Sequence, residues 1–105
     1  MSRKKNFKNL NDKMVKGITK SGFRFSINTD IFRDMEFLEL LAKVDKEDFS
    51  IIPDFLTKFL GDRQKKNLYE FCRDDKGIVD AFKVSDVLRE IMESNDLKNS
   101  LSLPR

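Results

Sequence analysis

The side chains that could take part in chemistry are few in this sequence and poorly placed for catalysis. The carboxylates Asp34 and Glu39, or Glu90 and Glu93, lie close enough along the chain to suggest an acid/base pair. Such a pair needs a desolvated pocket that separates the two pKa values. These residues stand instead among surface positions of expected helices, with Lys and Arg nearby. We therefore interpret them as charges that keep the protein in solution.

The inventory of histidine and cysteine restricts the chemistry further. The chain has no histidine and a single cysteine, Cys72, so it lacks the commonest general base and cannot form an internal disulfide. We interpret Cys72 as a small buried apolar residue on a helix. The stretch from Cys72 to Lys83 has the glycine of a calcium-binding loop, but a cysteine and two lysines occupy three ligand positions. We expect no catalytic residue, no metal site and no cofactor, and hence not an enzyme.

Length and composition allow one small domain. The chain has 105 residues, of which ten are phenylalanine and 37% are charged, so a packed core is possible despite the high charge. The longest apolar stretch, residues 51–60, contains a proline and two charges and is far shorter than the ~20 residues of a membrane span. The amino terminus has no apolar signal segment. These features predict a cytoplasmic protein that does not contact membranes.

The positive charge is concentrated at the amino terminus. Residues 1–20 contain seven Lys or Arg and one Asp, a net charge of +6, whereas the rest of the chain has 14 basic and 17 acidic residues, a net charge of −3. Because residues 1–20 are polar and lack sustained periodicity, we predict a disordered basic arm. The arm could be a solvated tail or could bind phosphate groups. The first reading is favoured because the folded part shows no basic face.

Residues 21–94 are expected to form the folded domain. The pattern predicts a mainly α-helical fold, a small bundle of about four helices preceded by one short β-strand. We expect the helices at residues 29–45, 49–61, 62–73 and 81–93. Residues 95–105 turn polar and are predicted to be a disordered tail.

The predicted strand covers residues 22–28. It alternates strictly, with Phe23, Phe25 and Ile27 on one side. The only internal candidate for pairing with it is the short segment 77–79. If that segment does not pair, the strand edge is free for another chain.

The first helix carries more apolar surface than a helix at the surface of a bundle needs. Two adjoining stripes contain Ile31, Met35, Leu38, Leu41 and Ala42, and Phe37, Leu40 and Val44. Together they cover about 220° of an ideal helix, compared with about 100° for a surface helix. The helix is therefore either central in the bundle, the commoner arrangement, or exposes a stripe to a partner. For the second case we predict that the partner-binding residues are Phe37, Leu40, Val44, Phe23 and Phe25.

Five segments in order form a wider pattern. They are residues 22–28 (GFRFSIN), 34–42 (DMEFLELLA), 60–62 (LGD), 73–79 (RDDKGIV) and 84–92 (VSDVLREIM). In order and spacing this set resembles the short tail assembly chaperones of long-tailed phages and prophages of Gram-positive bacteria. The resemblance covers about 70 residues, from Gly22 to Glu93, and leaves the basic arm outside it.

The resemblance implies a non-structural phage protein that acts in the cytoplasm of the bacterial host and is absent from the mature virion. Its implied partners are the long, aggregation-prone tape measure protein, the tail tube protein and further copies of the chain itself. Members of this family are often also made in a longer, frameshifted form. The alternative is a small regulatory protein that binds nucleic acid through residues 1–20, which the lack of a convincing recognition helix disfavours.

Overall fold

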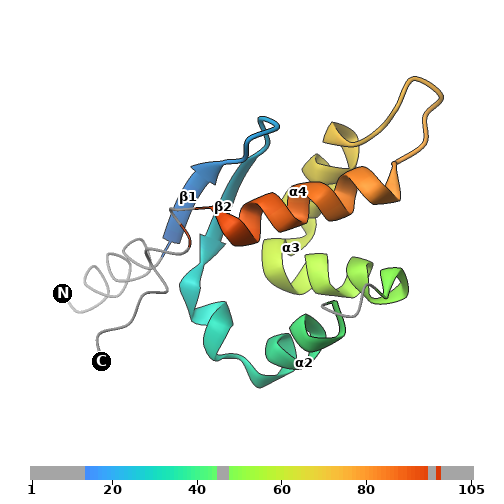
Figure 1. Ribbon diagram of the computed structural model, residues 1–105. Helices are drawn as coiled ribbons and strands as arrows, with labels where there is room; N and C mark the ends of the chain where they lie inside the picture. Colours follow the sequence, from blue (N-terminus) through green and yellow to red (C-terminus); the bar gives the residue numbers. More distant parts are fainter. Residues whose placement is uncertain (1–13, 45–47, 95–96, 98–105) are drawn as a thin grey trace.

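We describe the protein from a computed structural model that covers residues 14–44, 48–94 and 97 (Figure 1). In chain order the elements are β1 (Met14–Ile18), β2 (Arg24–Asn28), the 3-10 helix η1 (Thr29–Arg33), α2 (Met35–Val44), the 3-10 helix η2 (Phe49–Ile51), α3 (Ile52–Phe71) and α4 (Ala81–Glu93). The described part is mostly helical, as predicted. The predicted number of about four helices is slightly off, because these residues contain three α-helices.

The predicted strand is half of a hairpin. β1 pairs antiparallel with β2, with Gly17 opposite Phe25. In the loop, the Gly22 N–H donates to the Thr19 carbonyl (3.0 Å) and the Thr19 N–H donates to the Phe23 carbonyl (2.8 Å). Gly22 has a φ of +103°, which a glycine adopts readily and which suits a three-residue hairpin loop.

The hairpin begins inside the segment for which the sequence predicts a disordered arm. Residues 14–18 form β1 and Thr19 is buried, so the arm cannot extend to residue 20. The apolar alternation typical of a strand is missing here because Gly17 occupies a position opposite Phe25 and supplies no side chain. Residues 1–13 lie outside the described part of the chain.

β2 does not pair with segment 77–79, the internal candidate from the sequence. Val79 forms an isolated bridge with Arg73 instead. The outer edge of β2 is occupied by the side chain of Gln64 from α3, which accepts a hydrogen bond from the Ser26 N–H (2.8 Å) and donates one to the Ser26 carbonyl (2.8 Å). An amide side chain thus stands where a third strand would bind.

The first predicted helix is divided at Asp34. Asn28 starts η1 by accepting the Asp30 N–H (2.9 Å), and Asp34 starts α2 by accepting the N–H groups of Glu36 (2.8 Å) and Phe37 (3.2 Å). Each carboxylate or amide oxygen satisfies N–H groups that have no partner within the helix. Two caps in seven residues therefore produce two helices, and Figure 1 shows the chain changing direction between them.

α3 changes direction at Gly61, where φ is +83° and ψ is 162°. The sequence predicts two helices that meet at this glycine, and the structure has one assigned helix with a break in that place. Figure 1 shows its two halves running in different directions. Only glycine adopts this backbone conformation readily.

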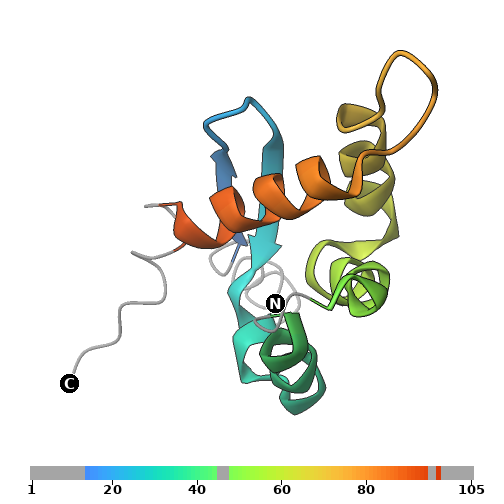
Figure 2. The same cartoon turned by 45° about the vertical axis from the view of Figure 1, so that its right-hand side comes forward.

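The core lies where the hairpin, α3 and α4 meet. Figures 1 and 2 show that α4 crosses two elements. Its C-terminal end lies across the hairpin, and its N-terminal end lies beside the second half of α3. The buried side chains are Phe23, Phe25, Ile27, Phe37, Ile52, Phe55, Leu56, Phe59, Leu60, Leu68, Cys72, Val84, Val87, Leu88, Ile91 and Leu97. Burial also raises the pKa of the Cys72 thiol.

Leu97 extends the packed chain beyond α4. The sequence places it in a predicted disordered tail, whereas its side chain is fully buried in the core and its N–H donates to the Ser94 hydroxyl (3.2 Å). A single apolar residue among polar neighbours has no periodicity that could reveal such a contact. Residues 95–96 and 98–105 lie outside the described part of the chain.

Candidate functional site

A cluster of phenylalanine rings holds α2 against α3. The ring of Phe37 stacks on those of Phe55 and Phe59, with centroids 5.1 Å and 5.5 Å away, and meets Phe32 edge-on at 5.5 Å. Such pairs contribute stability beyond the area they bury. The cluster therefore decides which side of α2 faces the core.

Charged groups join the same two helices at the start of α2. The Lys58 ammonium of α3 lies 3.2 Å from Asp34 and 3.3 Å from Glu36. The hydrogen bond from Lys58, followed by that from the Phe37 N–H, lowers the pKa of Asp34, and the same carboxylates raise the pKa of Lys58. These groups are solvated, so their effect on stability is small, but they anchor the end of α2 that carries the Asp34 cap.

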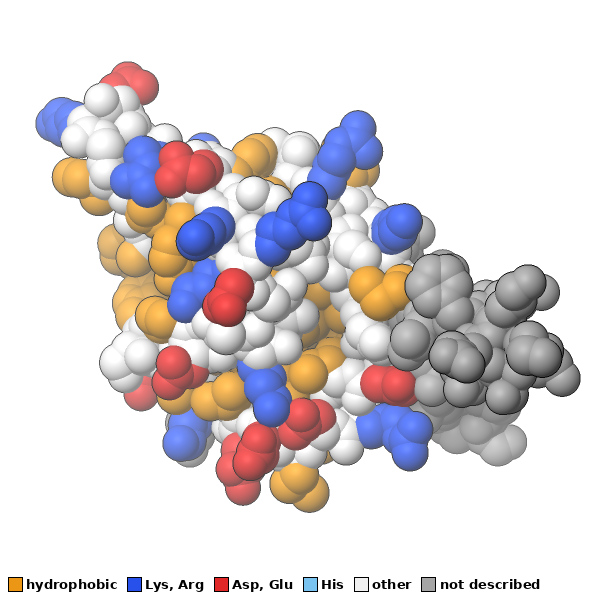
Figure 3. All heavy atoms as spheres, turned by 180° about the vertical axis from the view of Figure 1, so that it is seen from behind, with side chains coloured by type: hydrophobic (Ala, Val, Ile, Leu, Met, Phe, Trp, Pro, Cys, Tyr) orange, Lys and Arg blue, Asp and Glu red, His pale blue; other side chains and the backbone are white. Residues whose placement is uncertain are grey.

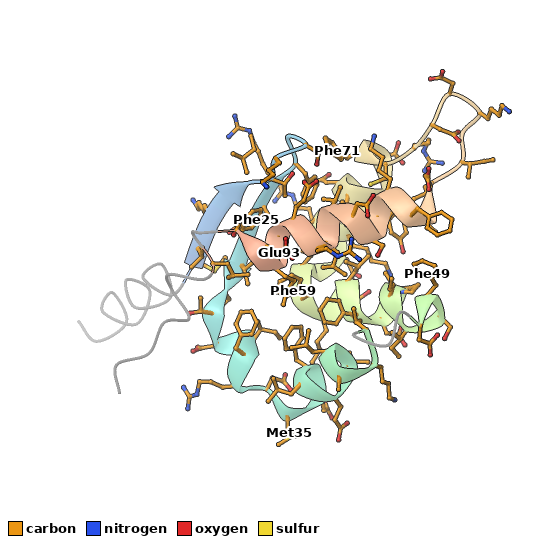
Figure 4. All side chains as sticks on the ribbon, viewed as in Figure 1. Phe25, Met35, Phe49, Phe59, Phe71 and Glu93 are labelled. Carbon is orange, nitrogen blue, oxygen red and sulfur yellow. The ribbon has the colours of Figure 1, made fainter. Side chains whose placement is uncertain are left out.

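Between α2 and α4 lies a groove of about 380 Å³, floored by the first half of α3. We call it the interhelical groove. It is lined by Leu41, Val44, Phe49, Ile52, Phe55, Ser85, Leu88, Arg89, Met92 and Glu93. Phe49 lies toward one end of the groove and Glu93 toward the other (Figure 4). The lining is mainly apolar, with its charged groups on α4.

Next to this groove three large apolar side chains stand in solvent. Phe82 is 71% exposed, Ile78 58% and Phe49 42%. The rings of Phe49 and Phe82 meet edge to face, with centroids 5.5 Å apart. We call Phe49 and Phe82 the aromatic patch; Ile78 is exposed on the loop that precedes α4. Exposed apolar groups gathered in this way are typical of an interaction surface.

A second hollow of about 240 Å³ connects the patch with the groove. It is lined by Phe49, Ile52, Pro53, Tyr69, Val79, Ala81 and Val84. Phe49 and Ile52 line both hollows, so the apolar surface passes around η2 without interruption. Figure 3 shows hydrophobic side chains gathered on the molecule's edge beside the protruding loop of residues 72–80.

The loop that presents Ile78 is held by several hydrogen bonds. The Ile78 N–H donates to the Asp74 carboxylate (3.0 Å), and the Asp74 N–H donates to the Ile78 carbonyl (2.8 Å). The Arg73 guanidinium donates to the Gly77 carbonyl (2.7 Å) and pairs with Glu70 at 2.6 Å. Ile78 is therefore exposed on an ordered loop with defined hydrogen bonds.

The five residues predicted to bind a partner fall into two groups. Phe37, Phe23 and Phe25 are buried, so in this fold they are core residues. Leu40 and Val44 are half-buried and pack against the core, and Val44 also lines the interhelical groove. Of the predicted set, Val44 alone belongs to the groove.

Part of the apolar arc of the first helix is exposed, but at Met35 and Leu38 of the other stripe, whereas Ile31 and Leu41 of that stripe pack against the core. Met35 is 67% exposed and Leu38 is 37% exposed, whereas Phe37 faces α3. The phenylalanine cluster explains the difference, because a large ring at position 37 meets two rings already in the core. Periodicity alone does not distinguish two adjoining stripes.

The sequence reasoning did not single out Phe49, Ile78 or Phe82 as binding residues. Phe82 carries the clearest signal, since its position does not lie on the buried stripe of α4 formed by Val84, Leu88 and Ile91. A large aromatic residue outside the core stripe of an amphipathic helix is a candidate contact residue.

Together the fold and the site define a small α-helical protein with a β-hairpin and a continuous exposed apolar surface. Compared with known proteins, the chain matches no family model, no curated protein and no solved structure. None of the helices in the described residues is long and apolar enough to cross a membrane. Within the same residues, no three potential metal-ligating side chains gather at one place.

Proposed function

We propose that this chain is a phage tail assembly chaperone that binds amphipathic helical segments of the tape measure protein. The order of sequence blocks supports the proposal through the family resemblance. The aromatic patch, continuous with the interhelical groove, carries it structurally. Helix-in-groove recognition uses this kind of apolar channel between helices, and a tape measure protein would offer long apolar stripes that must be covered before the tail tube assembles around them.

The experiment is co-expression with the tape measure protein of the same phage or prophage. The parent chain should increase the soluble fraction of the tape measure protein and should be recovered with it. Phe82→Ser, in the aromatic patch, should weaken this complex at least about tenfold, as expected for a central aromatic contact. Met35→Ser is the matched control, because Met35 is similarly exposed but lies on α2, well away from Phe49 (Figure 4).

Two results would contradict the proposal. The first is an unchanged soluble fraction of the tape measure protein, and the second is an equal loss of binding in Phe82→Ser and Met35→Ser. Circular dichroism should show that Phe82→Ser stays folded, because Phe82 is 71% exposed. Mass spectrometry of infected cells and of purified virions tests the proposed location of the chain. The chain should be present in the infected cytoplasm and absent from mature particles.

A further inference from the structure

The hydrogen-bonding pattern of the hairpin shows which way the backbone of β1 points. Thr19 and Phe23 form a hydrogen-bonded pair next to the loop. In an antiparallel ladder such pairs alternate with pairs that are not hydrogen-bonded. The third pair after it, Lys16 opposite Ser26, is therefore not hydrogen-bonded, and the backbone N–H and C=O groups of both residues point away from the hairpin.

Gln64 confirms this direction on one edge. The backbone N–H and C=O of Ser26 are both taken by the Gln64 amide at 2.8 Å, so the outer edge of β2 is closed. On the opposite edge, the outward groups belong to Lys16 and, by the same alternation, Ile18. Among the described residues the sheet has two strands, and none of these residues pairs with the outer edge of β1.

The outward side chains of the hairpin are basic. Residues 14–28 contain Lys16, Lys20 and Arg24 and no Asp or Glu. Lys20 lies near Glu90 of α4, which accepts hydrogen bonds from Ser21. Lys16 and Arg24 are exposed and form no ion pair with another described residue.

These two cations border an open depression on the outer face of the hairpin. Its volume is about 510 Å³, and it is lined by Lys16, Gly17, Ile18, Arg24, Phe25, Ser26 and Gln64. Ile18 beside them is 54% exposed. The depression lies over the face of the hairpin and reaches from β1 to Gln64 at the edge of β2. The free backbone groups of the β1 edge are therefore bordered by a face with unpaired positive charge and one exposed apolar side chain, Ile18.

We propose that β1 accepts an extended acidic segment of another protein as a third strand. The main-chain groups of Lys16 and Ile18 would bond to that strand, as in other cases of strand addition. A carboxylate opposite Lys16 would complement the charge of this edge. The surface is separate from the aromatic patch, so the inference stands independently of the chaperone function.

Two other occupants fit the edge less well. A second copy of the chain would bring another Lys16 and Arg24 to the same place, and like charges across strands are destabilising. Single-stranded nucleic acid is bound by basic grooves that also offer aromatic rings for stacking, but Phe23 and Phe25 of the hairpin are buried.

A selection with random peptides tests the proposal on the intact chain. Twelve-residue peptides displayed on phage are selected on the immobilised full-length protein, and the enriched peptides are then labelled for fluorescence anisotropy. Enriched sequences should be rich in Asp, Glu and β-branched residues. Hydrogen exchange measured by NMR should show new protection of the Lys16 and Ile18 amides when peptide binds.

Three variants separate backbone pairing from charge. Ile18→Pro removes one outward N–H and leaves the charge unchanged, and it should weaken peptide binding at least about tenfold. Ile18→Thr retains that N–H and should bind within about threefold of the parent chain. Lys16→Glu, which leaves the backbone intact, should weaken binding at least about tenfold and remove most of its dependence on salt. Phe82→Ser should bind the peptides like the parent.

Any of several results would overturn the proposal. These are the absence of enriched peptides, enrichment of basic peptides, equal binding to Ile18→Pro and the parent, or amide protection in the interhelical groove in place of β1. Tight binding of a labelled 20-nucleotide single strand that Lys16→Glu abolishes, with no peptide enriched, would assign the edge to nucleic acid. If Ile18→Pro unfolds the hairpin, Lys16→Glu and the hydrogen-exchange pattern decide the question.

Discussion

At the scale of single residues, phenylalanines of this chain stand in opposite environments, some buried in the core and some exposed to solvent. Phe37 is fully buried against two other rings, whereas Phe82 is 71% exposed. Both lie on amphipathic helices, and their type does not distinguish them. What differs is the neighbourhood, since Phe37 faces α3 and Phe82 stands near the first turn of α4 beside Phe49.

Replacing Phe37 by Ala should lower the free energy of unfolding by about 3–5 kcal/mol, because a large cavity opens in a packed core. Met35→Ala, at a 67% exposed position of the same helix, should change it by less than about 0.5 kcal/mol. Urea unfolding followed by circular dichroism measures both. Similar values for the two variants would mean that Phe37 is not the centre of the cluster.

The Glu90 carboxylate makes stability depend on pH. The hydrogen bond from the Ser21 hydroxyl (2.7 Å) lowers the pKa of Glu90 below its usual 4.5. The stabilisation is therefore fully present above about pH 4.5, the value in the unfolded chain, and is lost as the pH falls through the lower folded pKa. Urea unfolding between pH 7 and pH 3 should show a smaller acid-induced loss in Glu90→Gln than in the parent chain.

Glu93→Gln is the control for this experiment. Glu93 lies on the same helix and is exposed. A change in pH dependence that both variants share would come from the loss of a charge on α4 and not from the bond to Ser21. Part of the acid sensitivity should persist in Glu90→Gln, because Asp34, Asp48 and Glu70 also have lowered pKa values from hydrogen bonds with Lys58, Ser50 and Arg73. Identical pH profiles of parent and Glu90→Gln would exclude a contribution from the bond to Ser21.

At the scale of elements, a few backbone features orient the helices and the hairpin. Asp34 separates η1 from α2, and Gly61 divides α3. The second half of α3 is then placed where Gln64 reaches the edge of β2. Local turns and one side chain thus set the angles that larger apolar contacts stabilise.

Gly61→Ala should destabilise the protein by about 1–3 kcal/mol, the strain of a non-glycine residue in this backbone conformation. No atom beyond the neighbouring backbone lies within 4 Å of the position that an added Cβ would take, so the cost comes from the local backbone conformation alone. Thermal unfolding should show a Tm at least about 4 °C lower. Lys66→Ala, at an exposed position in the second half of α3, should leave the Tm nearly unchanged; an equal Tm for Gly61→Ala would contradict the expected strain.

Gln64→Leu should cost about 1–3 kcal/mol, because the Ser26 N–H and C=O lose their partner in a partly buried place. Gln64→Glu, which can still accept from the N–H, should be intermediate. Urea unfolding gives the energies, and amide exchange of Ser26 shows whether the N–H has become accessible. Unchanged exchange at Ser26 in Gln64→Leu would show that another group covers this edge.

At the scale of the whole molecule, the described surface is unevenly apolar. The interhelical groove and the second hollow share Phe49 and Ile52, and Phe49 also belongs to the aromatic patch. The outer face of the hairpin carries Lys16 and Arg24. The molecule therefore presents two chemically different surfaces on different elements. One suits an apolar helical partner and the other an acidic strand.

Without a partner, the aromatic patch should drive association of the chain with itself. Sedimentation velocity at increasing protein concentration should show a rising mean mass for the parent chain. Phe82→Ser should remain closer to the monomer at every concentration, because the most exposed large apolar side chain of the described residues is removed. A parent chain that stays monomeric throughout, or a Phe82→Ser variant that associates equally, would contradict this expectation.

Much of the local structure can be predicted from sequence, because short-range chemistry specifies it. The bounds of α4, the helix break at Gly61 and the common face of Phe23, Phe25 and Ile27 agree with the structure. Each depends on residues a few positions apart, through helical periodicity, strand alternation or the conformational freedom of a glycine.

Only the tertiary structure decides which of several apolar faces is buried and which segments pair with one another. It shows that Phe37 is buried while Met35 is exposed, that residues 14–18 pair with β2, and that Leu97 belongs to the core. It also brings Phe49 and Phe82, far apart in sequence, into one patch. A sequence pattern states that a face is apolar, but burial depends on what packs against that face, and this is determined by contacts between residues far apart along the chain.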